Sequence, residues 1–203
     1  ATGPAGDDFS ANQEEFKDVC ASDTTKALEF YEAAKKDLGK DNFSFEMIVD
    51  DTEIQQNVAA VIKEEIESTL PGITITLRVE PKKQRVEDCQ NGNFCLALTR
   101  WGPDYADPMT YLAMWVTNNS NNYGLWSNAD YDALIAETTT GDLCTDLTGR
   151  WAALKQAEKI AMDEAVIFPL YTQANADMIK ANVTGVEFHP CALNRVYKNT
   201  VKG

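Results

Sequence analysis

The sequence predicts an α/β fold in which a mixed sheet is flanked by helices. Apolar residues alternate with period two over 73–79, which is typical of a half-buried strand. The run FCLALT at 94–99 is continuously apolar, which indicates a strand buried on both faces. Helical patterns separate these runs, and this alternation favours parallel strands joined by right-handed crossovers.

Hydrophobic periodicity along the chain predicts the individual elements. They are core strands at 43–49, 73–79 and 94–99, a further strand at 166–172 that Pro169 limits to an edge or a bulge, and helices at 24–38, 53–68, 128–137 and 150–164. The first helix has Ser22 or Asp23 as its N-cap and Gly39 as its stop. Thr52 and Gln55 form a capping-box signature before the second helix.

The charge balance excludes some classes of partner. The 203 residues include 18 Lys and Arg against 32 Asp and Glu, and the net charge of −14 repels nucleic-acid phosphates and anionic membranes. We therefore expect no nucleic-acid partner, and a cationic or amine-bearing ligand suits this field better. No apolar run approaches the roughly 20 residues of a membrane-spanning helix. The polar opening ATGPAGDDF, which lacks an initiator Met, predicts a segment of a longer protein.

Histidine and cysteine usage argues against catalysis and metal binding. The only histidine, His189, lies in the tail, so neither a Ser-His-Asp triad nor a His-rich metal site can be built. The five cysteines show no zinc spacing and are odd in number. Cys89 and Cys95 are close enough in sequence to form a disulfide, and small buried thiols are the alternative. We expect a non-enzymatic protein with no cofactor and no metal.

The stretch RWGPDYADPM at 100–109 carries the candidate binding residues. It leaves a strand at its carboxyl end, where open α/β sheets bind ligands, and its prolines predict an ordered loop. Trp101 and Tyr105 offer flat contact surface and Asp104 offers a carboxylate, which together suit an extended peptide with a terminal amine. The residues alone leave open that Trp101 is a core residue and Asp104 a turn residue. A further hypothesis is a glycoside hydrolase that uses Asp104 and Asp107 as its two carboxylates.

Three motifs resemble one protein family. WGPDYADP is similar to the W-G-x-D-Y-x-D-P stretch of the extracellular peptide-binding proteins of ABC importers, the oligopeptide-, dipeptide- and nickel-binding solute receptor family. NNSNNYGLWSNADYDALI resembles the Asn-rich loop and helix start of that family, and RWAALKQAEKIAMDEAVIFPLY resembles its A-E and I-P-L-Y segment. The three motifs stand in the family's order, and the likeness covers about residues 43 to 190.

The resemblance implies one lobe of a two-lobed, periplasmic-binding-protein-like fold. Residues 1–186 would be the C-terminal lobe, and residues 187–203 a segment that crosses back to the first lobe, which is absent from this chain. The whole receptor would lie outside the cell or in the periplasm, anchored by a lipidated N-terminus outside this sequence. It would capture peptides and deliver them to ABC permease subunits in the membrane.

The resemblance also implies roles for residues of the loop. Asp104 would pair with the α-ammonium group of the peptide, Trp101 would line a side-chain pocket, and the backbone from Arg100 to Gly102 would pair with the peptide. Tyr105 is a further candidate, which more simply shapes the loop. Other members bind nickel complexes, haem or sugars on the same scaffold, so a sugar or a metal chelate remains an alternative ligand.

Overall fold

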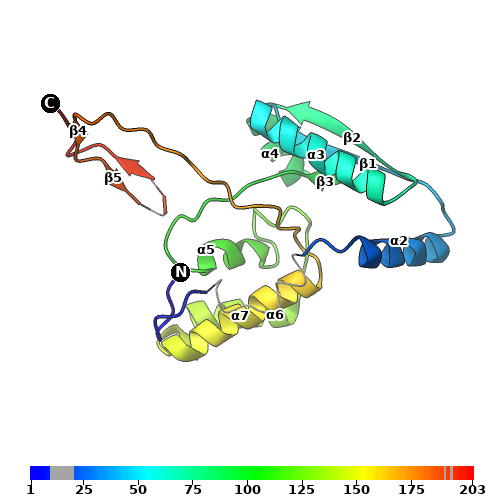
Figure 1. The fold of residues 1–203 in the computed structure, drawn as a ribbon. Coiled ribbons are helices and arrows are strands. Elements are labelled where there is room, and N and C mark those ends of the chain that lie inside the picture. Colours follow the sequence, from blue (N-terminus) through cyan, green and yellow to red (C-terminus); the bar gives the residue numbers. More distant parts are fainter. Residues whose placement is uncertain (10–20, 190, 193) are drawn as a thin grey trace. The chain divides into compact units, whose positions relative to one another are not determined.

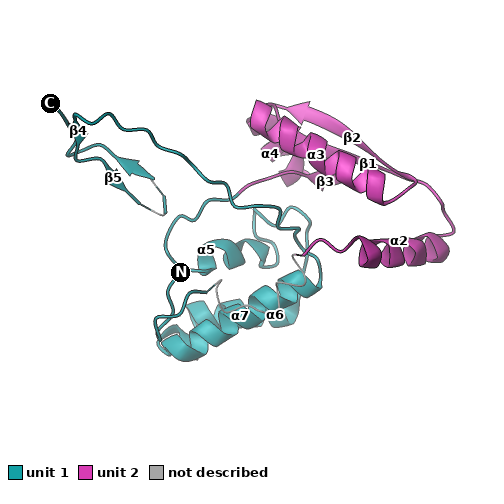
Figure 2. Cartoon of the chain, viewed as in Figure 1, with its two compact units in different colours: residues 1–20, 101–203 teal, residues 21–100 magenta. Residues whose placement is uncertain are grey.

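The computed structural model describes residues 1–203 except 10–20, 190 and 193. The chain divides into two compact units, which Figure 2 distinguishes by colour. Unit 1 comprises residues 1–20 and 101–203, and unit 2 comprises residues 21–100. Among the described residues, no helix has both the length and the apolar character needed to cross a bilayer.

Unit 2 contains a three-stranded parallel sheet with β1 (Phe43–Asp50) at its centre. β1 pairs along its whole length with β2 (Ile73–Glu80), and at two positions with β3 (Leu96–Ala97). The helix α3 (Glu53–Thr69) connects β1 to β2, and α4 (Lys82–Gln90) precedes β3 (Figure 1). Parallel strands alternating with helices confirm the predicted α/β class. All three strands of this sheet are parallel rather than mixed in direction, and the antiparallel strand pairs among the described residues form separate two-stranded sheets in unit 1.

The most buried residues of the sheet lie in β1, and the prediction of a doubly buried strand at 94–99 is wrong. Ile48 and Val49 in β1 are completely buried. In contrast, β3 is only two residues long, and the preceding Cys95 is exposed. The reason is position in the sheet: β1 has a neighbouring strand on each side, whereas β3 lies at an edge. A continuous apolar run does not distinguish these two positions.

The helix ends of unit 2 confirm one predicted cap and correct another. The helix α2 (Thr24–Leu38) begins after Asp23, whose carboxylate accepts a hydrogen bond from the Lys26 N–H at 3.0 Å, and it stops at the left-handed Gly39. Thr52 is the N-cap of α3, but its side chain makes no capping hydrogen bond. Gln55 is buried instead of reaching back to Thr52, so the predicted capping box does not form.

Unit 1 is built on helices. They are α5 (Met109–Leu112), η1 (Ala113–Trp115), α6 (Ala129–Thr139), η2 (Asp142–Cys144) and α7 (Leu147–Asp163), of which α6 and α7 lie close to predicted ranges. Asn128 caps α6, because its side-chain oxygen accepts hydrogen bonds from the N–H groups of Asp130 and Tyr131. Asp146 caps α7 in the same way through the Gly149 N–H. The predicted helices at 128–137 and 150–164 are therefore confirmed, with α7 starting three residues early.

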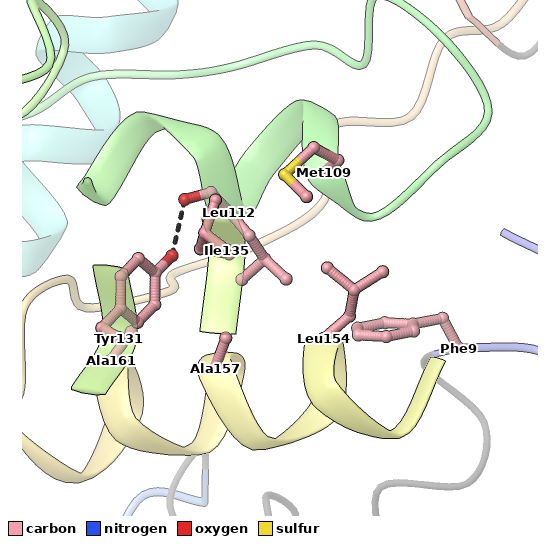
Figure 3. Close-up of a cluster of buried hydrophobic side chains, with 8 residues drawn as sticks. All are labelled: Phe9, Met109, Leu112, Tyr131, Ile135, Leu154, Ala157 and Ala161. Atoms are coloured by element: carbon pink, nitrogen blue, oxygen red, sulfur yellow. Dashed lines mark hydrogen bonds between the residues drawn. The ribbon is translucent and has the colours of Figure 1, made fainter. Parts of the chain in front are cut away.

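The core of unit 1 lies between α5, α6 and α7 (Figure 3). Its buried side chains are Phe9, Met109, Leu112, Tyr131, Ile135, Leu154, Ala157 and Ala161. The small residues of α7 allow α6 to approach closely, and the Tyr131 hydroxyl donates a hydrogen bond of 2.5 Å to the Leu112 carbonyl. This bond ties α6 to α5, and α5 directly follows the candidate binding loop.

The last part of the chain differs from the predicted strand at 166–172. These residues form no strand in the structure, and Phe168 is 72% exposed. Pro169 lacks the N–H group that a sheet ladder needs, and no strand in the described part of the chain pairs with this segment. Beyond it, β4 (Val183–Thr184) pairs with β7 (Val201–Lys202), and β5 (Glu187–Phe188) pairs with β6 (Arg195–Val196), both antiparallel. Assigning residues 1–186 and 187–203 to different lobes remains a prediction.

Candidate functional site

The candidate binding loop connects β3 to α5 and presents several side chains to solvent. Trp101 is 42% exposed and Tyr105 is 48% exposed. Asp104 is also exposed. Trp101 is therefore not a core residue of the described chain.

The Asp104 carboxylate is unpaired, although its backbone is anchored. The Asp104 N–H donates a hydrogen bond of 3.0 Å to the Thr110 hydroxyl oxygen in α5. The carboxylate itself forms no hydrogen bond or ion pair with any residue that the structure describes. An anchored backbone with a free carboxylate is suited to binding a cation from outside the loop.

Asp107 has the opposite arrangement, because Arg150 of α7 holds its carboxylate. The guanidinium nitrogens Nη1 and Nη2 donate to the two carboxylate oxygens at 2.8 and 3.0 Å, and the Met109 N–H donates to Oδ1 at 2.9 Å. Burial disfavours the charged form, but the hydrogen bonds from Arg150 and Met109 outweigh it and hold the pKa of Asp107 below its usual range. The same contact with Asp107 raises the pKa of Arg150.

This arrangement does not support the hydrolase hypothesis for Asp104 and Asp107. A glycoside hydrolase needs one carboxyl group that can donate a proton and a second that acts as a base or nucleophile. Asp107 is ionised and occupied by a bidentate arginine, so it is suited to neither role. Its position indicates that it fixes the loop against α7.

The other two candidate residues lie at the start of the loop. Gly102 is exposed, and a Cβ added to it would meet no atom within 4 Å, so its backbone is open to an approaching chain. Arg100 has an exposed side chain and is the last residue of unit 2, whereas Trp101 and the rest of the loop belong to unit 1.

Sequence reasoning missed a contact between the loop and the tail of the chain. The Ala192 N–H donates a hydrogen bond of 2.9 Å to the Pro103 carbonyl. The neighbouring Cys191 lies near Tyr111 of α5, and burial, with a smaller contribution from Cys191, raises the pKa of the Tyr111 phenol. No local pattern in the sequence indicates this contact, because it joins segments far apart in the chain.

The cysteines and the single histidine form neither a disulfide nor a metal site among the described residues. Cys89 and Cys95 are free, so the predicted disulfide alternative is wrong, and Cys89 is a buried thiol whose pKa burial raises. Cys20 lies outside the described residues. His189 is half exposed, with its Nε2 atom 4.0 Å from a carboxylate oxygen of Glu187. The described residues contain no group of three or more acidic, histidine or cysteine side chains that could hold a metal ion.

Comparison with known proteins identifies the family to which this chain belongs. Residues 1–123 match the family described as bacterial extracellular solute-binding proteins, family 5 Middle. The chain therefore belongs to this family of solute-binding proteins, as the motif resemblance predicted. The family is one of binding proteins, in agreement with the expectation of a non-enzymatic chain.

Individual relatives show how much of a family member this chain represents. It is 35% identical over 190 residues to the dipeptide-binding protein of Lactococcus lactis, covering 93% of this chain and 34% of that protein. It is 30% identical to a probable deoxycholate-binding periplasmic protein of Escherichia coli, covering 71% of this chain and 26% of that protein. The substrate-binding domain of an oligopeptide ABC transporter from Bacillus anthracis superposes with a TM-score of 0.88 at 36% identity, covering all of this chain and 38% of that one. The chain thus spans between 26% and 38% of the length of these three relatives.

Proposed function

We propose that this chain is the part of a peptide receptor that binds the amino terminus of its ligand. The observation that carries the proposal is the Asp104 carboxylate, which is exposed and unpaired in a loop whose backbone is anchored. An ammonium group is the natural partner for such a carboxylate, because a charge-assisted hydrogen bond is stronger than a neutral one. The strongly acidic charge of the chain also favours a cationic group.

The surroundings of Asp104 suit the rest of a peptide. Trp101 offers an exposed ring against which a peptide side chain packs, and Gly102 leaves room for an extended backbone to pair with the loop. Arg100 directly precedes Trp101 in the chain and Tyr105 directly follows Asp104, and the proposal includes both as further contacts. The names of the relatives from Lactococcus lactis and Bacillus anthracis support a peptide as the ligand class.

The cellular role proposed here follows from the family. As part of an extracellular or periplasmic receptor, the chain would close on a peptide together with the first lobe and deliver it to ABC permease subunits. Residues 187–203 would cross back to that lobe, and a lipid on the N-terminus of the whole protein would anchor it to the membrane. The ABC transporter from Bacillus anthracis, whose substrate-binding domain has the same fold, supports this role.

The relative named for deoxycholate binding favours a second ligand class, a steroid acid. Deoxycholate is an anion, and an unpaired Asp104 would repel its carboxylate, so we place this ligand second. A sugar or a metal chelate is the remaining alternative, and the names of the relatives from Lactococcus lactis and Bacillus anthracis favour a peptide over it.

Isothermal titration calorimetry on the full-length protein tests the proposal. Free peptides, the same peptides with acetylated amino termini, and deoxycholate are titrated into wild type, Asp104→Asn and the control Asp142→Asn, which changes another exposed aspartate. We expect acetylation and Asp104→Asn each to weaken peptide binding on the order of 10- to 100-fold, with the control unchanged. Tight peptide binding that survives both changes excludes Asp104 as the anchor. Binding of deoxycholate but of no peptide overturns the ligand class.

A further inference from the structure

Thr110 is buried at the start of α5 and contacts both carboxylate-bearing residues of the binding loop. Its hydroxyl oxygen accepts the hydrogen bond from the Asp104 N–H at 3.0 Å, and its own N–H donates to the Asp107 carbonyl at 3.1 Å. Thr110 is 5% exposed, as are its neighbours Met109 and Leu112. The residue therefore joins the loop to the buried core of unit 1.

The two ends of this loop are held by different groups. Asp107 is fixed by its ion pair with Arg150 and by the Met109 N–H, and neither contact involves the Thr110 hydroxyl. In contrast, the hydrogen bond to Thr110 is the one that the structure records for Asp104. Loss of the hydroxyl therefore leaves the end of the loop at Asp107 attached, while it releases the backbone of Asp104.

We propose that Thr110 is a positioning residue that sets the direction of the Asp104 carboxylate toward the ligand amine. The inference rests on the proposed function and deepens it. The backbone N–H of Asp104 and its side chain start from the same Cα atom, so a fixed N–H limits where two side-chain torsions can place the carboxylate. A charge-assisted contact needs donor and acceptor within about 3 Å, and a displacement of about 1 Å weakens it strongly.

The hydroxyl, rather than the size of the side chain, makes this contact. Valine is β-branched like threonine and of similar size but lacks the acceptor, so Thr110→Val removes the hydrogen bond and leaves the side-chain volume nearly unchanged. Serine keeps the hydroxyl and loses one methyl group, so Thr110→Ser restores the contact at the cost of a small cavity. The pair of variants separates positioning from packing.

The test is the ratio of the dissociation constants of an N-acetylated peptide and its free counterpart, measured on the full-length protein. We expect a ratio of about 10 to 100 in wild type, a roughly tenfold smaller ratio in Thr110→Val, and the wild-type ratio in Thr110→Ser. Affinity for the acetylated peptide should change less than twofold, because that peptide does not use the Asp104 charge. Thermal unfolding of each variant is recorded in parallel, and Thr110→Ala replaces Thr110→Val if the latter does not fold.

The outcomes separate this inference from the proposed function. A high wild-type ratio that falls in Asp104→Asn but not in Thr110→Val or Thr110→Ala overturns the positioning role and leaves the amine anchor standing. Equal weakening of both peptides, or loss of discrimination in Thr110→Ser as well, assigns Thr110 a packing role and also overturns the inference. A wild-type ratio near one overturns the proposed function, and the inference falls with it.

Discussion

Arg150 of α7 holds Asp107 of the binding loop through two parallel hydrogen bonds of 2.8 and 3.0 Å. The Arg150 Nε also donates to the Thr138 carbonyl near the end of α6, at 3.2 Å. One side chain thus connects the loop to two helices of unit 1. Because both partners are largely shielded from solvent, the ion pair is stronger than one on an open surface.

Loss of the Asp107 to Arg150 contact should destabilise unit 1. We expect Arg150→Ala to lower the free energy of unfolding by about 1 to 3 kcal/mol, because a charged group loses hydrogen bonds in a partly buried site. A double-mutant cycle with Asp107→Asn, measured by denaturant unfolding of the full-length protein, isolates the pair. Lys159→Ala is the control, since its pair with Asp163 is exposed and worth about 0.5 kcal/mol or less. A coupling energy near zero would contradict the prediction.

The lowered pKa of Asp107 predicts a component of stability that depends on pH. The folded pKa lies below the unfolded value of about 3.9, so this component is fully present above that value. It is lost as the pH falls through the folded pKa, where the native carboxylate takes up its proton. Unfolding free energies measured from about pH 6 to pH 2 should therefore fall more steeply for wild type than for Asp107→Asn. Parallel curves for the two proteins would show that Asp107 carries no such linkage.

The core beneath the loop should be sensitive to two substitutions of different kinds. Leu154→Ala opens a cavity at a completely buried position and should cost about 2 to 5 kcal/mol. Tyr131→Phe leaves the buried Leu112 carbonyl without its partner and should cost about 1 to 3 kcal/mol. Leu147→Ala on the exposed side of α7 serves as the control, with an expected change below about 0.5 kcal/mol. Chemical denaturation of the full-length variants gives all three values.

Side chains from α3 occupy backbone groups of the edge strand β2 in unit 2, and we expect them to prevent another strand from pairing there. The Ile75 N–H of the edge strand β2 donates to Glu67 at 2.7 Å, and the Ile75 carbonyl accepts from Lys63 at 2.6 Å, both from α3. Open backbone groups on an edge strand pair with other chains. We expect Glu67→Ala with Lys63→Ala to promote self-association, whereas Glu67→Gln keeps an acceptor and should not. Sedimentation velocity at several concentrations measures this, and a monomeric double variant would contradict it.

Local patterns in the sequence were sufficient to predict most of the helices and two of the strands. The range of α2 was predicted to the residue, because Asp23 and Gly39 mark its two ends chemically. β1 and β2 were each predicted to within one residue from apolar periodicity. The capping box at Thr52 failed because Gln55 is drawn into the core, a tertiary effect that a capping pattern does not contain.

The placement of strands within the sheet depended on contacts that the local sequence does not specify. The apolar runs at 94–99 and 166–172 both have strand-like composition, yet the first gives only the short edge strand β3 and the second gives no strand. Burial of a strand requires neighbours on both sides, and those neighbours come from other parts of the chain. Composition alone therefore predicted too much sheet.

The candidate binding loop shows most clearly which features local sequence predicts and which depend on tertiary contacts. Its place after a strand, its exposed aromatic residues and its two aspartates were evident from RWGPDYADPM, because prolines and charged groups impose a local structure. Nothing in those ten residues distinguishes Asp104 from Asp107 as a free carboxylate. Arg150, which is 43 positions beyond Asp107, pairs with it and leaves Asp104 unpaired. An ion pair between segments so far apart forms only when α7 packs beneath the loop, and this is why the fold was needed to identify which of the two carboxylates is unpaired.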